Sequence, residues 1–229
     1  MCGRKYSTYS EEELHLRYLN HRQIELGLMP NFNFCPTQSG PVVRMVDGEL
    51  RIDIFRWGLV PSWAKDEKAG GYSLINAKAE EITEKRTYKV PFQKRRCVVP
   101  ISGFIEWRSE PSGKRPFSIF LKTQPIMSLA GIWEFWERDG KSVHSYSVIT
   151  TAANSFMADI HTRMPVILSR EDESRWLDPQ AEVRELQNLL KSSRSENMRA
   201  IEISRLVNSP KNNSPEVLLP VDASEMRRN

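Results

Sequence analysis

The chemically unusual feature of this sequence is a cysteine directly after the initiator methionine, in Met1-Cys2-Gly3-Arg4. Cysteine is small enough for the preceding methionine to be removed, which would leave an α-amine and a thiol on one residue. Such an amine titrates near neutrality, at about 7.7–8.0, so part of it is the free base that condenses with aldehydes. The neighbouring thiol can then close a five-membered ring. On these residues alone, Cys2 is either an ordinary terminal residue or an aldehyde-reactive group.

Two further side chains have chemistry that suits such a group. Glu106 lies in the aromatic, apolar run GFIEW at residues 103–107, where a carboxylate needs either an ion-pair partner or a raised pKa that suits proton transfer. His161 lies near the end of a predicted helix, because Pro165 disfavours helix at Met164. Each has a plain alternative, a structural ion pair for Glu106 and a hydrogen-bonding surface or core residue for His161.

The composition is typical of a soluble globular protein. The 229 residues are 39% hydrophobic and 27% charged, without an internal repeat or a Gly/Ser-rich linker, so we predict one domain over residues 1–229. No apolar run approaches the roughly 18 residues of a membrane span, and the N-terminal region does not have the pattern of a signal peptide. We therefore expect no membrane association, and a location in the cytoplasm of a bacterium or the nucleus of a eukaryote.

The cysteines do not indicate a metal site. Cys2, Cys35 and Cys97 are widely spaced and odd in number, which matches neither a disulfide framework nor a zinc signature. We expect three reduced thiols, no metal and no cofactor.

Positive charge is concentrated in one segment. The net charge is +4, but residues 85–96 read KRTYKVPFQKRR, with six basic residues, no acidic one, and the aromatics Tyr88 and Phe92 between them. This composition is typical of a track that binds a nucleic-acid backbone and stacks bases, and equally of a solvated surface loop. Trp57 and Trp63, in WGLVPSW, pose a similar choice between core packing and an exposed stacking surface.

Local patterns predict an α+β fold. Ser10 and Glu13 form a capping box that predicts a helix over 11–21. Asp-Gly turns at 47–48 and 139–140 predict two hairpins, with strands at 42–46 and 50–55 and at 128–137 and 142–150. Further predictions are helical segments at 76–81 and 152–160, a buried strand at 97–100, a helix beginning at Asp178-Pro179 with an apolar stripe of Val183, Leu186, Leu189 and Leu190, and a short strand from Ile201. Strands grouped in hairpins indicate mainly antiparallel sheet.

Taken together, the motifs resemble the SRAP family, the SOS-response-associated peptidase domain. The matching segments are CGR at 2–4, NFCPTQ at 33–38, WGLVPSW at 57–63, NAKAE at 76–80, GFIEW at 103–107 and HTRMP at 161–165, and NSP at 208–210 is similar to the family's C-terminal signature. The resemblance covers nearly the whole chain. It implies a single SRAP domain in which antiparallel sheets form a barrel-like core with peripheral helices.

The resemblance implies a protein that senses abasic sites in single-stranded DNA and crosslinks to them. Its N-terminal cysteine would form a Schiff base and then a thiazolidine with the aldehyde of the opened deoxyribose. The matching catalytic residues are Cys2, Asn76, Glu106 and His161. We expect Cys2 to supply both nucleophiles, Glu106 to move the amine proton, Asn76 to orient the amine or sugar, and His161 to act as acid or base on the sugar oxygen.

Removal of Met1 is a condition of this chemistry, because a retained Met1 acylates the Cys2 nitrogen. The form that carries Met1 is therefore predicted to be unable to crosslink. The family is named for a peptidase activity that would expose the cysteine by self-cleavage, whereas an aminopeptidase could remove a single methionine. Finding only the mature Cys2 terminus by mass spectrometry would show that the unprocessed form is not the one present.

The resemblance also implies DNA contacts. Basic side chains would meet phosphates near the lesion, and a tryptophan and a proline would stack on bases or wedge between them. The predicted DNA-binding residues are Arg4, Pro36, Trp57, Trp63, Lys78, Arg86, Thr150 and Arg163. Lys78 stands where the family has arginine and lacks the planar bidentate fork, so its phosphate contact is expected to be weaker. Cys35, where a small residue is common, is interpreted as packing. The expected partner is abasic single-stranded DNA, bound by a monomer.

Two other functions stay open. A cysteine peptidase using Cys2 and His161 would need an activated thiolate but no free α-amine. A noncatalytic reader of single-stranded or modified DNA would keep its function after Cys2→Ala.

Overall fold

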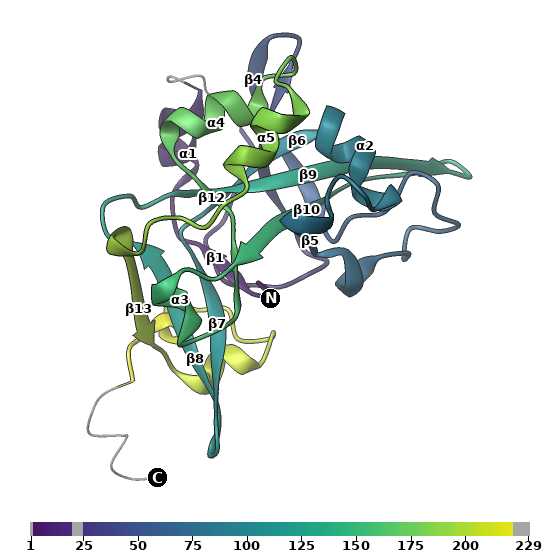
Figure 1. Cartoon of the computed structure of the whole chain (residues 1–229). Coiled ribbons are helices and arrows are strands. Elements are labelled where there is room, and N and C mark those ends of the chain that lie inside the picture. Colours follow the sequence, from purple (N-terminus) through teal and green to yellow (C-terminus); the bar gives the residue numbers. More distant parts are fainter. Residues whose placement is uncertain (1, 20–24, 222–229) are drawn as a thin grey trace.

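The computed structural model describes residues 2–19 and 25–221, so the prediction about Met1 lies outside the described residues. A closed β-barrel organises the larger part of the fold (Figure 1). Its five strands, in ring order, are β10 (Lys141–Ala152), β4 (Glu49–Trp57), β3 (Ser39–Val46), β6 (Arg96–Ile101) and β9 (Met127–Arg138). Pairing of β9 with β10 closes the ring. Every pair in the ring is antiparallel except β4 with β10, which is parallel.

Short strands extend the barrel strands at their ends. β5 (Asn76–Lys78) and β11 (Arg163–Pro165) pair with β10, and β12 (Ile167–Leu168) pairs with β9. β10 therefore lies between residues 76–78 on one edge and residues 163–165 on the other.

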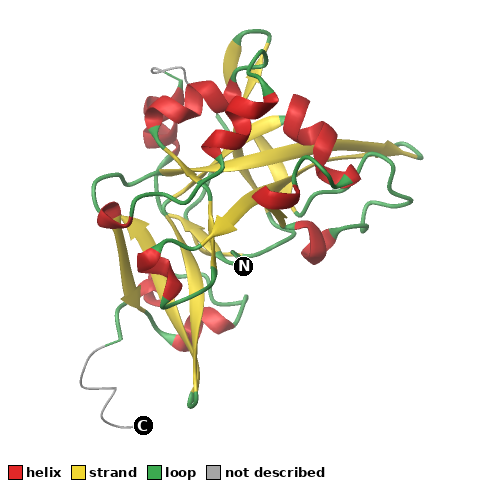
Figure 2. Ribbon diagram, in the orientation of Figure 1, coloured by secondary structure: helices red, strands yellow, loops and turns green. Residues whose placement is uncertain are grey.

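A second sheet lies beside the barrel, and all its pairings are antiparallel (Figure 2). Its order is β13 (Met198–Glu202), β8 (Gly113–Leu121), β7 (Gly103–Glu110), β1 (Lys5–Ser7) and β2 (Asn31–Phe34). Strands from the start of the chain and from beyond residue 197 thus join one sheet, and for this reason we retain the proposal of a single domain.

Five α-helices lie at the periphery in the described part of the chain: α1 (Glu11–Tyr18), α2 (Arg86–Lys94), α3 (Ser155–Ala158), α4 (Arg170–Leu177) and α5 (Val183–Leu189). Single 3-10 turns occur at η1 (Gly71–Leu74), η2 (Ala79–Glu81), η3 (Ser195–Asn197), η4 (Arg205–Asn208) and η5 (Pro215–Leu218). None of the helices within the described ranges combines the length and apolar character needed to cross a bilayer. The predicted α+β class with a barrel-like core is confirmed.

The core has two main parts. One lies between the barrel and the helices and includes Leu14 of α1, Phe92 of α2 and Trp176 of α4. The other lies between the barrel and the second sheet and includes Cys2. Cys2 is therefore enclosed by both sheets.

Both predicted hairpins are confirmed, because their turn chemistry is local. Asp47 and Asp139 have φ angles of 49° and 52°, and the glycine after each is also positive, at 82° and 72°. Positive φ at both central residues is the two-residue turn that Asp-Gly favours. The capping box is also present, with Ser10 Oγ accepting from the Glu13 N–H at 3.1 Å and Glu13 Oε2 accepting from the Ser10 N–H at 2.7 Å. Helix α1 ends at Tyr18, and part of the predicted end lies outside the described residues.

Three helix predictions are corrected. Residues 76–81 form β5 and then one 3-10 turn, because pairing with β10 holds the first three residues extended. In 152–160 only Ser155–Ala158 is α-helical, since Ala152 still belongs to β10 and Asn154 caps the helix. Asp178 ends α4 and does not begin the next helix, which starts at Val183.

Candidate functional site

Cys2 lies just before β1 and is fully buried. It packs in the core cluster that contains Phe34, Trp57 and Tyr146. Burial and, to a smaller extent, the Glu106 charge raise the pKa of the Cys2 thiol to about 12, and the Lys5 charge opposes both. At neutral pH the thiol is therefore protonated.

Asn76 holds the main chain of Cys2 in place. It begins β5, and its Nδ2 donates a hydrogen bond to the Cys2 carbonyl oxygen at 2.8 Å. Its Oδ1 is buried and has no hydrogen-bond partner among the described residues. The Tyr88 hydroxyl also donates to the Asn76 carbonyl at 3.2 Å. Asn76 thus orients Cys2 and offers one further acceptor beside it.

Glu106 comes to the site through the pairing of β7 with β1. The Ile105 N–H donates to the Arg4 carbonyl at 2.9 Å, so the next residue of β7 faces the chain just before Arg4. The Glu106 side chain is 3% exposed. Burial raises the pKa of its carboxyl group, while the His161 charge lowers it. Glu106 therefore keeps a proton to higher pH than an exposed glutamate does.

His161 follows α3 and is half-buried. The Arg163 N–H donates to Nδ1 at 3.0 Å. Nδ1 also lies 3.2 Å from the Arg163 carbonyl oxygen, so this nitrogen faces the main chain of Arg163. These two contacts fix the orientation of the imidazole ring.

The predicted catalytic residues converge on Cys2 from separate elements. Asn76 donates a hydrogen bond to Cys2. The charge of Glu106 raises the pKa of the Cys2 thiol, and the charge of His161 lowers the pKa of Glu106. The three side chains therefore belong to the same region of the fold as Cys2.

Lys5 belongs to the same buried region, although no sequence motif marks it. The residue is 1% exposed, and its Nζ donates to the Tyr146 hydroxyl at 2.8 Å. The Nζ atom lies 4.3 Å from the ring centroid of Phe34, 5.4 Å from that of Trp57 and 5.2 Å from that of Tyr146. Burial lowers the pKa of Lys5 to about 7. Lysine is almost never fully buried, and no local pattern in this short strand indicates that this one is.

Comparison with known proteins agrees with the motifs. The model of the family described as "SOS response associated peptidase (SRAP)" matches residues 1–210. The chain belongs to the SRAP family. It is 40% identical over 223 residues to the abasic site processing protein YoqW of Bacillus subtilis (strain 168), covering 95% of this chain and 99% of that protein. It is 32% identical over 226 residues to the abasic site processing protein HMCES of Gallus gallus, covering 84% of this chain and 67% of that protein.

A solved structure has the same fold. The crystal structure of a protein from Bacteroides thetaiotaomicron superimposes with a TM-score of 0.86 at 30% identity, covering 96% of this chain and 100% of that one. The family resemblance predicted from the motifs is therefore confirmed.

Three residues of the DNA-contact set predicted for this SRAP chain are buried, namely Trp57, Pro36 and Thr150. Trp57 is fully enclosed, and its indole N–H donates to the Ile75 carbonyl at 3.0 Å. It is a core residue, so the exposed stacking surface considered for Trp57 is wrong. Pro36 is also buried, which leaves it no open face on which a base could stack. Arg4 is partly buried, and its Nη1 donates to Asn33 Oδ1 and, at 2.7 Å, to the Val207 carbonyl.

Trp63 and Arg86 lie together on the surface. Trp63 is 55% exposed, and the Arg86 guanidinium carbon lies 5.1 Å from its ring centroid. Both residues remain predicted DNA contacts.

Lys78 and Arg163, two further members of the predicted set, face carboxylates. Arg163 binds Glu80 with two hydrogen bonds of 2.7 and 2.9 Å, and also bonds to the carbonyl and the hydroxyl of buried Thr150 at 2.6 and 3.3 Å. The exposed Lys78 ammonium lies 3.3 Å from Glu81. A phosphate would have to compete with these carboxylates, and the DNA roles of Lys78, Thr150 and Arg163 stay predictions.

The basic segment is neither a loop nor a stacking track. Most of it forms α2, and Tyr88 and Phe92 point into the core at 5% and 0% exposure. The stacking role predicted for these two aromatics is therefore wrong, because helical spacing turns them to the face that packs on the barrel. Arg96 is also buried, whereas Lys85, Arg86, Lys89 and Lys94 stay exposed.

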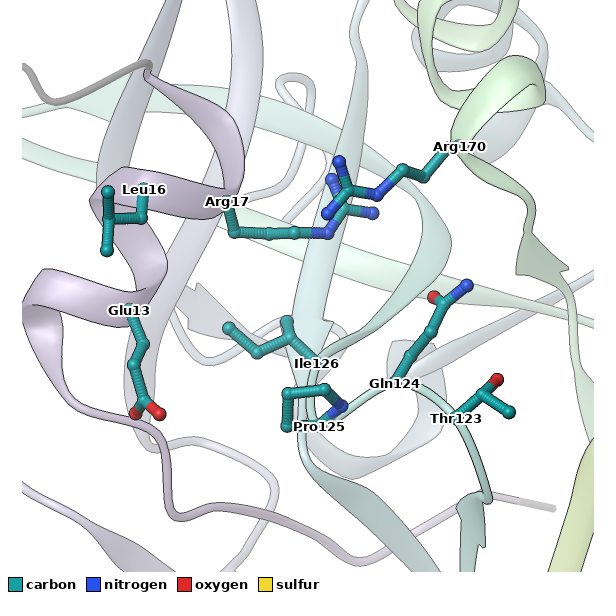
Figure 3. A pocket seen from close by; sticks show the side chains of 8 residues that line it. All are labelled: Glu13, Leu16, Arg17, Thr123, Gln124, Pro125, Ile126 and Arg170. Carbon is teal, nitrogen blue, oxygen red and sulfur yellow. The ribbon is translucent and has the colours of Figure 1, made fainter.

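A separate cavity of about 310 Å³ lies between α1 and the chain before β9 (Figure 3). Arg17 and Arg170 point into it above Ile126. The Arg17 guanidinium is bound by Glu173. None of the predicted catalytic residues lines this cavity, so the chemistry of the site lies elsewhere.

Proposed function

We propose that this protein senses abasic sites in single-stranded DNA and, once Met1 is removed, forms a covalent thiazolidine crosslink to them through Cys2, acting as a monomer. The observation that carries the proposal is the convergence of Asn76, Glu106 and His161 on Cys2. The names of the two abasic site processing relatives support it.

The proposed reaction has two covalent stages. First, the Cys2 α-amine attacks the aldehyde carbon of the opened deoxyribose, and loss of water gives a Schiff base. Glu106 takes the amine proton and returns it to the departing oxygen, while the His161 imidazole binds a sugar oxygen. Second, the thiol adds across the C=N bond, so that a C–S bond forms and the nitrogen gains a proton. Oδ1 of Asn76 accepts from the amine or a sugar hydroxyl throughout.

One observation disfavours the peptidase alternative. A cysteine peptidase attacks as the thiolate, which requires a lowered thiol pKa, but burial raises that of Cys2 to about 12. Thiazolidine closure begins from an electrophilic imine already tethered to the same residue, so proximity compensates for a small thiolate population.

A denaturing gel tests the proposal. The mature protein is incubated with a single-stranded oligonucleotide that carries one abasic site, and with the same site in a duplex. We expect a heat-stable and detergent-stable adduct that forms faster on the single strand. Cys2→Ala should give no such adduct. A normal yield from Cys2→Ala, or none from the wild type, contradicts the crosslink and, in the first case, favours a noncatalytic reader.

A blocked amine separates crosslinking from peptidase activity. A chain with an uncleaved N-terminal extension before Cys2 keeps the thiol but lacks the free amine. We expect it to form no adduct, whereas a cysteine peptidase would keep its activity.

Glu106→Gln tests the proton-transfer step. The amide keeps the size of the side chain but cannot accept the amine proton, so we expect adduct formation to slow by about 10²-fold or more. Glu106→Asp keeps the carboxyl group and should fall between the wild type and Gln. Equal rates for Gln and the wild type in single-turnover measurements would remove Glu106 from the mechanism.

A further inference from the structure

The proposed reaction leaves one requirement unassigned, which is an acceptor for the proton of the Cys2 thiol. The thiol lies in an apolar enclosure and holds its proton at neutral pH. Glu106 does not fill this role well, because its negative charge raises the pKa of the thiol. A neutral amine beside the thiol would accept the proton and leave a stabilising positive charge.

Lys5 supplies an amine in the same buried region. It lies three residues after Cys2, and its Nζ is enclosed by Phe34, Trp57 and Tyr146, the same rings that pack in the cluster with Cys2. The Lys5 charge lowers the pKa of the Cys2 thiol, and the charge of a Cys2 thiolate raises the pKa of Lys5. Each group therefore stabilises the ionised form of the other.

The enclosure suits a lysine that changes its charge. The titratable groups that face Lys5 are Tyr146 on β10, Cys97 on β6 and Cys2 ahead of β1. Burial also raises the pKa of Cys97 and of Tyr146, so both stay neutral. In the neutral enclosure, burial brings the lysine to a pKa of about 7, where both of its forms are populated. When the ammonium forms, the aromatic faces and the Tyr146 hydroxyl stabilise it.

We propose that Lys5 is the proton acceptor for the Cys2 thiol during thiazolidine closure, an inference that rests on the proposed function. As sulfur adds to the imine carbon, the thiol proton passes to Lys5 Nζ and the C–S bond forms. The π electron pair of the C=N bond moves to nitrogen, which takes a proton from solvent. Lys5 then releases its proton to solvent, so the closure is neutral overall and needs no other reactant.

The experiment measures the two covalent stages separately in mature protein at saturating abasic single-stranded DNA. Borohydride trapping reports the Schiff base, and the heat-stable adduct without borohydride reports ring closure. In the wild type we expect the closure rate to rise with pH through about 7, as Lys5 becomes neutral. Lys5→Met should slow closure by about 10²-fold and abolish that rise, with Schiff-base trapping within about twofold of the wild type.

Two further variants complete the test. Lys114→Met removes one exposed lysine and should change neither stage. Tyr146→Phe keeps the ring but removes the hydroxyl that accepts from Nζ, so the ammonium loses stabilisation and the midpoint of the pH rise should move to lower pH.

The outcomes separate the two proposals. A wild type that gives neither trapped Schiff base nor stable adduct refutes the proposed function. A wild type that gives both, with closure and its pH profile unchanged in Lys5→Met, refutes only the role of Lys5. If Lys5→Met does not fold, Tyr146→Phe decides, and an unmoved midpoint overturns the inference.

Discussion

Two cations of this protein lie over aromatic rings at similar distances but in different surroundings. Lys5 Nζ is 4.3 Å from the Phe34 centroid, and the Arg86 guanidinium carbon is 5.1 Å from that of Trp63. Lys5 is 1% exposed, whereas Trp63 is 55% exposed and Arg86 lies on the surface. The rings replace only part of the hydration that a buried ammonium loses, so the pKa of Lys5 falls to about 7. The surface pair stays hydrated and its charge is screened by salt. The same contact thus accompanies a cation of lowered pKa inside the fold and a hydrated, screened cation on the surface.

The largest effect expected from this difference is on stability. The unfolded chain holds the Lys5 proton up to a pKa of about 10.5, whereas the folded chain loses it near pH 7. Between these values the unfolded state binds more protons, so the stability of the folded state rises with pH. From pH 6.5 to pH 9.5, the free energy of unfolding of the wild type should rise by about 3 kcal/mol more than that of Lys5→Met. Chemical denaturation at both pH values measures this difference.

Comparing the wild type with Lys5→Met cancels the effect of all other titratable groups on stability, because the two proteins share them. Arg86→Met gives the matched control for the surface cation and should show no pH-dependent difference from the wild type. A constant difference between wild type and Lys5→Met across this range would mean that Lys5 is charged or solvated in the folded state.

The contrast also shows what the sequence could predict. The hairpins followed from Asp-Gly turns, whose backbone preference is local. Helix α4 was missed because it presents few apolar residues, with Trp176 and Leu177 as its buried hydrophobic side chains. A capping signal was present, since Ser169 Oγ accepts from the Asp172 N–H at 3.1 Å.

The burial of individual side chains could not be predicted from the composition of a segment. Trp57 and Trp63 belong to one motif, but the first ends a barrel strand and the second follows it. Cys2 and Glu106 suggested proton and aldehyde chemistry by residue type, and Asn76 was identified only through the family resemblance. Neither residue type nor the family resemblance pointed to Lys5, because the strands that enclose it are distant in sequence.

Arg96 is a buried cation in the same basic segment as exposed Arg86, so the two arginines can be compared directly. Its guanidinium donates to the main-chain carbonyls of Phe92, Gln93, Trp176 and Asp178. A lysine has three donors and no planar fork, so Arg96→Lys leaves carbonyls unsatisfied. We expect a loss of about 2 kcal/mol in the free energy of unfolding, measured by chemical denaturation.

The matched change at the exposed end of the same segment, Arg86→Lys, should cost less than about 0.5 kcal/mol. DNA affinity per folded molecule should not change in Arg96→Lys. A loss of affinity with stability intact would mean that Arg96 contacts DNA directly and that its carbonyl contacts are dispensable.

The smallest effect concerns the surface pair, and it is measured in a Cys2→Ala background so that only noncovalent binding is seen. Trp63→Ala removes a stacking face and should weaken single-stranded DNA binding by about 1 kcal/mol, or about fivefold. Arg86→Ala removes one phosphate contact and should reduce the slope of log affinity against log salt by about 0.7. Fluorescence anisotropy at several salt concentrations distinguishes the two, because loss of stacking alone leaves the slope unchanged. If neither variant alters affinity or slope, DNA does not pass over this pair, and the exposed cation over its ring is only a feature of the solvated surface.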